Sequence, residues 1–87
     1  MMEFELDPDT SAANEAKHGI NFTQAEDLWT DPLRFEVPAR TVDEERWLVI
    51  GQIEGRHWSA VVTYREGKVR LISVRRSRDE EVAIYES

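Results

Sequence analysis

The feature that most constrains the fold is a series of three apolar segments in the second half of the chain, separated by two short turns. The first segment, "RWLVIGQI" (46–53), is apolar on both faces, which is typical of a central strand covered on two sides. "HWSAVVTY" (57–64) and "VRLISV" (69–74) follow it, each after a turn typical of a β-hairpin, "EGR" and "REGK". The sequence therefore predicts a meander of three antiparallel strands.

The first half of the chain predicts helices instead. Asp7 followed by Pro8 is an N-cap with a proline in the first helical turn. The helix ends at Gly19, because glycine adopts the left-handed conformation of a C-cap, and the cations Lys17 and His18 suit the negative end of the helix dipole. The small side chains that recur on one face, and that we expect to pack on the sheet, are Ala12, Ala13 and Ala16.

Capping sequences predict two further helices. Asn21, with Gln24 three residues later, begins a second helix that ends at the Asp-Pro pair 31–32. Ser77, with Glu80 three residues later, begins a last helix that reaches the C-terminus.

Two shorter strands complete the pattern. "MEFEL" (2–6) and "LRFEV" (33–37) alternate apolar and polar residues, the first at a sheet edge, and residues 38–43 form a loop. The predicted order is strand, helix, helix, four strands and helix. The fold class is α+β, a compact antiparallel β-sheet flanked by two N-terminal helices and one C-terminal helix. Because 87 residues support one modest core, residues 1–87 form a single domain.

Composition limits the function classes. The chain has no cysteine, which excludes disulfides and thiolate metal sites, and neither a signal peptide nor a membrane span is evident. We expect a cytoplasmic protein with no membrane partner. The formal net charge is −7, yet residues 65–78 hold six cations and one acid, Glu66, so a basic segment stands inside an acidic chain.

Patterns for several enzyme classes are missing. His18 and His57 are far apart, and the carboxylates lack the spacing of metal ligands. No glycine-flanked serine suggests a hydrolase, and the four glycines form no phosphate-binding loop. We expect neither a metal nor a cofactor.

The remaining candidates are arginines at strand ends. Arg65 begins the tight turn before the last strand, and Arg75 and Arg76 lie at that strand's far end, so Arg65 and Arg75 need not meet unless the sheet curves. Regular alternation predicts two faces of the last strand, one with Arg70, Ile72, Val74 and Arg76 and the other with Val69, Leu71, Ser73 and Arg75.

Two interpretations of these cations stay open. Guanidinium groups are planar forks that bind phosphate and stabilise a phosphorane-like transition state, and Tyr64 could stack on a base. Alternatively, the arginines within 75–78 are a solvated run that pairs with the acids at 79–81, and the cations at 17–18 only cap their helix.

Several segments together are similar to one known family. Over nearly the whole chain, and in a specific order and spacing, they are "FELDP" (4–8), "AAN" (12–14), "KHGINF" (17–22), "DP" (31–32), "EERWLVIG" (44–51) and "RLISVRRS" (70–77). In these segments the chain resembles BrnT-type toxins of bacterial type II toxin–antitoxin modules, in the RelE/ParE-like ribonuclease superfamily. The resemblance implies a RelE-like sheet flanked by helices, a ribonuclease that inhibits translation, and neutralisation by a ribbon-helix-helix antitoxin.

The chemistry implied by the resemblance is metal-independent cleavage of RNA, in which the ribose 2′-hydroxyl attacks the neighbouring phosphate. His18 is the preferred residue for proton transfer, because histidine is the side chain that exchanges protons near neutral pH. The catalytic residues that the resemblance implies are Lys17, His18, Arg65 and Arg75, and the RNA-binding residues are Arg46, Tyr64 and Arg76.

Two functions therefore compete. The first is a ribonuclease toxin whose partners are RNA and a cognate ribbon-helix-helix antitoxin, and which meets DNA only through that antitoxin. The second is a non-catalytic, toxin-like partner that acts as co-repressor with the antitoxin, and the acidic balance of the chain motivates it. Cleavage of RNA by the purified protein separates the two.

Overall fold

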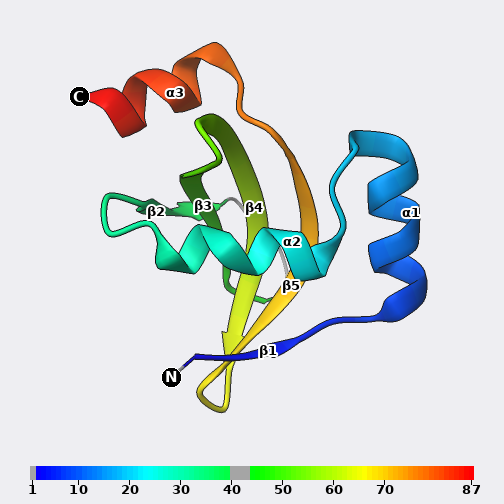
Figure 1. Ribbon diagram of the computed structural model, residues 1–87. Helices are drawn as coiled ribbons and strands as arrows, with labels where there is room; N and C mark the ends of the chain where they lie inside the picture. The colour runs from blue at the N-terminus through cyan, green and yellow to red at the C-terminus, as the bar shows by residue number, and fades with distance from the viewer. Residues whose placement is uncertain (1, 40–43) are drawn as a thin grey trace.

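A five-stranded sheet with the order β1–β5–β4–β3–β2 organises the chain (Figure 1). The computed structural model describes residues 2–39 and 44–87. In chain order the elements are β1 (Glu3–Glu5), α1 (Pro8–His18), α2 (Phe22–Ala25), the 3₁₀ helix η1 (Glu26–Thr30), β2 (Phe35–Ala39), β3 (Arg46–Ile53), β4 (Arg56–Arg65), β5 (Lys68–Arg76) and α3 (Asp79–Glu86). The predicted α+β class and the predicted order of elements are confirmed.

The sheet is mixed, which corrects the prediction of a purely antiparallel one. Strands β2 to β5 form an antiparallel meander, whereas β1 pairs with β5 in parallel. No hairpin joins β1 to β5, so no tight turn fixes their relative direction. β3 is an interior strand between β4 and β2, and its adjacent residues Val49 and Ile50 are both buried, which confirms a strand covered on both faces. Of the predicted loop at 38–43, Pro38 and Ala39 belong to β2, and residues 40–43 lie outside the described residues.

A β-bulge interrupts β5. Val61 of β4 pairs with Ser73, but the next residue of β4, Val62, pairs with Leu71. Ile72 is therefore one extra residue in β5, and beyond it the side chains exchange faces relative to a regular strand.

The bulge overturns the predicted faces of β5. Leu71 and Val74 are three residues apart, yet both are buried in the same core. Arg75 consequently lies on the face that carries Arg70, and the predicted grouping of Arg70 with Arg76 is wrong. The prediction that Arg75 and Arg76 point in opposite directions is confirmed, because their partners lie on opposite faces of the sheet.

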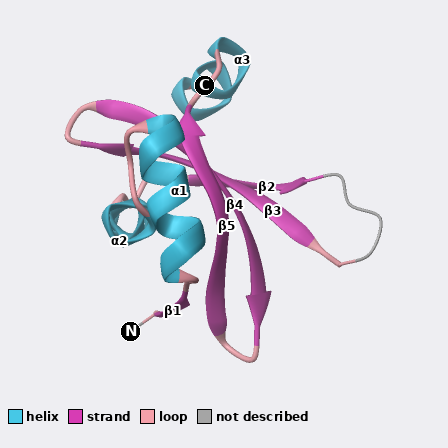
Figure 2. Cartoon of the chain, turned by 90° about the vertical axis from the view of Figure 1, so that its right-hand side faces the viewer, coloured by secondary structure: helices cyan, strands magenta, loops and turns pink. Residues whose placement is uncertain are grey.

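Helices cover the two faces of the sheet unequally (Figure 2). α1, α2 and η1 pack on one face, and the largest fully buried side chains between these layers include Phe22, Leu28, Val49 and Val62. α3 packs on the other face, only at the end remote from the β4–β5 hairpin. We call the part of that second face between α3 and the β4–β5 hairpin the open face.

The buried side of α1 is polar, contrary to the prediction. Ser11 and Asn14 are the buried residues of this helix, and the three alanines at 12, 13 and 16 are exposed. The Asn14 amide donates to the carbonyl oxygens of Ile20 (2.8 Å) and Val74 (2.9 Å) and accepts from the Val74 N–H (3.1 Å). Asn14 thus replaces a missing strand along the edge of β5, a requirement that outweighs apolar packing.

A second side chain, that of Asp31, hydrogen-bonds to a strand backbone, at β3 beyond the residues that pair with β2. The Asp31 carboxylate follows η1 and accepts from the Gln52 N–H of β3 (2.9 Å) and from the Tyr85 hydroxyl of α3 (2.8 Å). These hydrogen bonds lower the pKa of Asp31 against the opposing effect of burial, which is the largest single influence. One carboxylate therefore joins β3 to α3.

The helix caps follow the sequence at three of four places. Asp7 caps α1, Gly19 ends it with a φ of 79°, and the Asn21–Gln24 capping box begins α2. The Ser77–Glu80 prediction is wrong, because α3 begins at Asp79 and the carboxylate that accepts from the Arg78 N–H belongs to Glu81.

Candidate functional site

The open face carries a row of two arginines with a threonine between them. Thr63 of β4 pairs with Arg70 of β5. On the other side of β4, Trp47 of β3 pairs with Val62, so the preceding residue, Arg46, lies beside Thr63. Adjacent strands lie about 4.8 Å apart, so the backbones of Arg46 and Arg70 are about 10 Å apart. Two guanidinium groups can therefore approach one ligand group over this row. Thr63 itself is only 3% exposed, and its hydroxyl donates to the Glu45 carbonyl oxygen at 2.9 Å, so the ligand would meet the guanidinium groups and not the threonine.

A second row of cations follows at the hairpin. Arg65 pairs with Lys68, two residues beyond the Thr63–Arg70 pair and therefore on the same face. The open face thus has four cationic side chains, contributed by three neighbouring strands.

Weak ion pairs neutralise these cations only in part. Lys68 Nζ lies 3.9 Å from Glu3 Oε2, and Arg46 Nη2 lies 3.7 Å from Glu44 Oε1, and exposed pairs of this kind contribute little. Within residues 2–39 and 44–87, the other two cations make no ion pair, and the buried Nε of Arg46 has no hydrogen-bond partner. Glu5, the strand partner of Arg70, adds a third carboxylate to those of Glu3 and Glu44, so the four cations of the open face are offset only in part, in a chain of net charge −7.

Arg75 lies on the same face of the sheet, but underneath α3. Its guanidinium group donates to both carboxylate oxygens of Glu81, at 2.7 and 2.8 Å. The Ser59 hydroxyl (2.9 Å) and the Arg78 N–H (2.8 Å) also donate to Glu81 Oε1. Of the two interpretations left open by the sequence, pairing with the acidic run describes Arg75.

This ion pair changes the ionisation of both groups. Glu81 is only 6% exposed, but the hydrogen bond from Arg75 outweighs burial and lowers the pKa of Glu81 to about 2. The same hydrogen bond raises the pKa of Arg75. The charge of Arg75 is thus compensated within the protein, and the pair fastens α3 to the sheet.

The predicted residues Lys17, His18 and Arg76 lie at one end of the helix-covered face. Arg76 stacks over Trp58, 5.5 Å from the ring centroid. Trp58 also lines a hollow of about 440 Å³, together with the two residues that follow α1, Gly19 and Ile20. Lys17 is exposed and His18 is half-buried. We call this group, Lys17, His18, Trp58 and Arg76, the α1 pole.

Tyr64 lies on the helix-covered face as well, but at the hairpin end. It packs against the core, and its hydroxyl donates to Glu36 Oε1 at 2.6 Å. Burial first, and this hydrogen bond second, raise the pKa of Tyr64 to about 12. The ring and the hydroxyl are therefore already engaged within the protein.

The structure divides the predicted site into separate groups. Arg65 and Arg75 share a face but stand at opposite ends of the β4–β5 pair. Arg65 of β4 lies beside Lys68, and the seven residues of strand from Lys68 to Arg75 span about 20 Å. Arg65 and Arg75 cannot touch the same phosphate. Arg46 joins Arg65 on the open face, whereas the α1 pole lies on the other face.

Sequence reasoning missed two residues of the open face, Lys68 and Arg70. Both belong to the basic segment 65–78, so the sequence identifies them as cations of that segment. Their grouping with Arg46 depends on the register between three strands, and their separation from Arg76 depends on the bulge at Ile72. Neither the register between the strands nor the bulge can be predicted from a local sequence pattern.

Two further observations concern the described ranges 2–39 and 44–87. They contain no helix with the length and apolar character needed to cross a membrane. They also contain no group of three or more histidine, aspartate or glutamate side chains placed to hold one metal ion.

Comparison with known proteins agrees with the resemblance found in the sequence. Residues 6–81 match the family model described as a ribonuclease toxin, BrnT, of type II toxin–antitoxin systems. A comparison with curated proteins gave no match. The matched segment includes the α1 pole and all four cations of the open face, and it spans most of the chain. The chain therefore belongs to the BrnT family of ribonuclease toxins of type II toxin–antitoxin systems.

Proposed function

We propose that this protein is an endoribonuclease toxin that binds single-stranded RNA across its open face. The observation that carries the proposal is the row Arg46–Thr63–Arg70 with the Arg65–Lys68 pair beside it, on the part of the sheet that no helix covers. RNA phosphates bind cationic grooves in this way. The family description supplies the reaction class.

The proposed reaction is transesterification within the RNA. The 2′-oxygen of the ribose forms a bond to the neighbouring phosphorus, and the bond from phosphorus to the 5′-oxygen breaks. The products are a 2′,3′-cyclic phosphate and a 5′-hydroxyl, and the proton lost by the 2′-hydroxyl is balanced by the proton gained at the 5′-oxygen. Arg65 and Arg46 would stabilise the extra negative charge on the phosphate in the transition state.

The α1 pole is the second candidate for the reacting phosphodiester. His18 is the residue that the resemblance implies for proton transfer, Lys17 is its neighbour in the chain, and Arg76 holds positive charge over Trp58 on the face that α1 covers. The two candidates lie on different faces, so one set of variants separates them.

The experiment measures cleavage of a single-stranded RNA by the purified protein, and binding of the same RNA with 2′-O-methyl riboses that cannot react. We expect Arg46→Ala and Arg65→Ala to weaken binding and to slow cleavage together. Arg78→Ala removes the same charge from an exposed position outside both groups and is the control. Normal cleavage by both open-face variants, with loss in His18→Ala or Arg76→Ala, would move the site to the α1 pole.

The biological part of the proposal is inhibition of translation in the cytoplasm and neutralisation by a ribbon-helix-helix antitoxin. Induction of the chain alone should arrest growth and break transcripts, and the folded variants that do not cleave RNA should be harmless. If the purified protein cuts no RNA but still represses transcription together with an antitoxin, the co-repressor function replaces the ribonuclease.

A further inference from the structure

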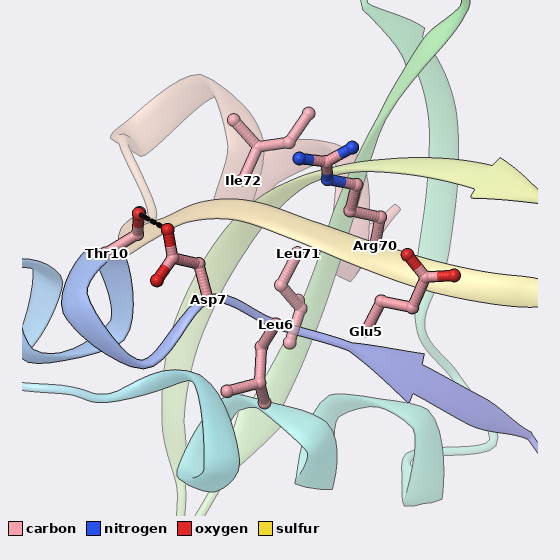
Figure 3. A pocket seen from close by; sticks show the side chains of 7 residues that line it. All are labelled: Glu5, Leu6, Asp7, Thr10, Arg70, Leu71 and Ile72. Carbon is pink, nitrogen blue, oxygen red and sulfur yellow. Dashed lines mark hydrogen bonds between the residues drawn. The ribbon is translucent and has the colours of Figure 1, made fainter.

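A hollow of about 390 Å³ lies at the outer edge of β5, where the chain leaves β1 and enters α1 (Figure 3). This volume is within the range of small-molecule sites. The hollow adjoins the open face, because Arg70 belongs to both.

The strand pairing explains why there is space at this edge. β1 pairs only with residues 68–70 of β5, and Asn14 of α1 binds the backbone of Val74. The bulge residue, Ile72, lies between these two covered stretches. The half-buried side chains of Leu6 and Ile72 give the hollow its apolar wall from opposite sides of β5, and Leu71, which is 4% exposed, lies at its base in the core (Figure 3).

The rim of the hollow carries both positively and negatively charged side chains. The Arg70 guanidinium extends on the same side of β5 as Ile72 (Figure 3). In the described part of the chain, neither Arg70 nor Glu5 has an ion pair or a side-chain hydrogen bond. On the α1 side, the Thr10 hydroxyl donates to Asp7 at 3.2 Å.

This combination of groups selects a class of ligand. Arg70 suits a phosphate, but the carboxylates of Glu5 and Asp7 would repel a bare inorganic anion. The same carboxylates accept hydrogen bonds from ribose hydroxyls or from the exocyclic amine of a base, and the apolar wall suits the ring. A ligand with phosphate, hydroxyl and ring groups matches all three parts of the hollow.

We propose that the hollow is a nucleotide subsite, in which Arg70 binds the phosphate and the apolar wall receives the base of one RNA nucleotide. The inference rests on the proposed function, because it makes this nucleotide part of the bound RNA. Arg70 is the link, since it pairs with Thr63 and stands in the row with Arg46. RNA would then run from the open face to the edge of β5.

The test is a titration of the isotope-labelled protein with cytidine 5′-monophosphate, followed by NMR, with cytidine and inorganic phosphate in parallel. We expect the nucleotide to shift the amide and methyl signals of Leu6, Leu71 and Ile72. Arg70→Ala should weaken nucleotide binding about tenfold or more, as expected for a charged hydrogen bond. Arg78→Ala should leave it unchanged.

A second variant separates a nucleotide subsite from a general anion site. Glu5→Gln keeps the shape of the side chain and removes its charge, so it should strengthen binding of inorganic phosphate and weaken the preference for the nucleotide. The proposal is overturned if inorganic phosphate binds the unaltered protein as tightly as the nucleotide does. It is also overturned if the nucleotide shifts only signals elsewhere, or if Arg70→Ala binds it normally.

Measuring both RNA cleavage and nucleotide binding distinguishes failure of this inference from failure of the proposed function. RNA cleavage without nucleotide binding in the hollow would overturn this inference and leave the ribonuclease in place. Nucleotide binding in the hollow by a protein that cuts no RNA would support the subsite and overturn the proposed enzyme.

Discussion

Replacement of Glu81 by glutamine tests the ion pair that holds α3 on the sheet. The carboxylate is 6% exposed and accepts four hydrogen bonds, two of them from Arg75. Its pKa falls from the ordinary value of 4.5 to about 2 on folding. At 1.36 kcal/mol for each pKa unit, the charged form contributes about 3 kcal/mol to the free energy of unfolding.

The sign of the pH dependence follows from the lowered pKa. The contribution of Glu81 is fully present above the unfolded pKa of 4.5 and is lost as the pH falls toward 2, where the folded protein also binds the proton. Glu81→Gln should therefore lower the free energy of unfolding by about 3 kcal/mol at pH 7. The variant should also lose most of the change in stability that the unaltered protein shows between pH 5 and 2.

The assay is urea denaturation at a series of pH values, followed by tryptophan fluorescence. Glu80→Gln is the matched control, because the neighbouring carboxylate is exposed and should change stability by less than about 0.5 kcal/mol. An equal and small effect of both substitutions at pH 7 would refute the reasoning. So would an acid transition in Glu81→Gln that has the same size as in the unaltered protein.

Three other predictions concern side chains that the structure explains individually. Asn14→Ala leaves the buried N–H and C=O of Val74 unpaired, and should cost about 3 kcal/mol and speed hydrogen exchange at the Val74 amide; an unchanged exchange rate would contradict it. Gly19→Ala puts a side chain at a φ of 79° with free space around it, and should lower stability by about 1 kcal/mol through backbone strain alone, as measured by urea denaturation. The pKa values of Tyr64 and Tyr85 are both raised to about 12, so spectrophotometric titration should detect no phenolate near pH 10 while the protein stays folded; a transition there would show that one hydroxyl is free.

Much of the fold follows from local sequence patterns. The two hairpins, the caps at Asp7 and Asn21 and the left-handed Gly19 are set by a few neighbouring residues, and each was predicted. The last helix was misplaced at its start because Ser77 and Glu80 form a capping pattern that competes with Glu81. The half-buried partner Arg75 selects Glu81, and this tertiary contact cannot be predicted from the local pattern.

The candidate site was predictable in its residue types but not in its arrangement. The basic segment 65–78 contains the cations of the open face that β4 and β5 contribute. Their distribution over two faces depends on the register across three strands and on the bulge. The polar inner side of α1 was also missed, since Asn14 serves a strand that is distant in sequence.

The extra residue at Ile72 also affects how the sheet tolerates insertion and deletion. Loss of this one codon would leave Leu71 opposite Val62 and Ser73 opposite Val61, so the ladder would become regular and every side chain beyond it would keep its face. A slip of one residue that takes Ile72 into the ladder would exchange the faces beyond it, but residues 75 and 76 are both arginine, so each face would still receive a guanidinium group at that end. The tandem arginines thus make the charge of both faces insensitive to a slip of one residue, whereas the contact between Arg75 and Glu81 is not protected in this way.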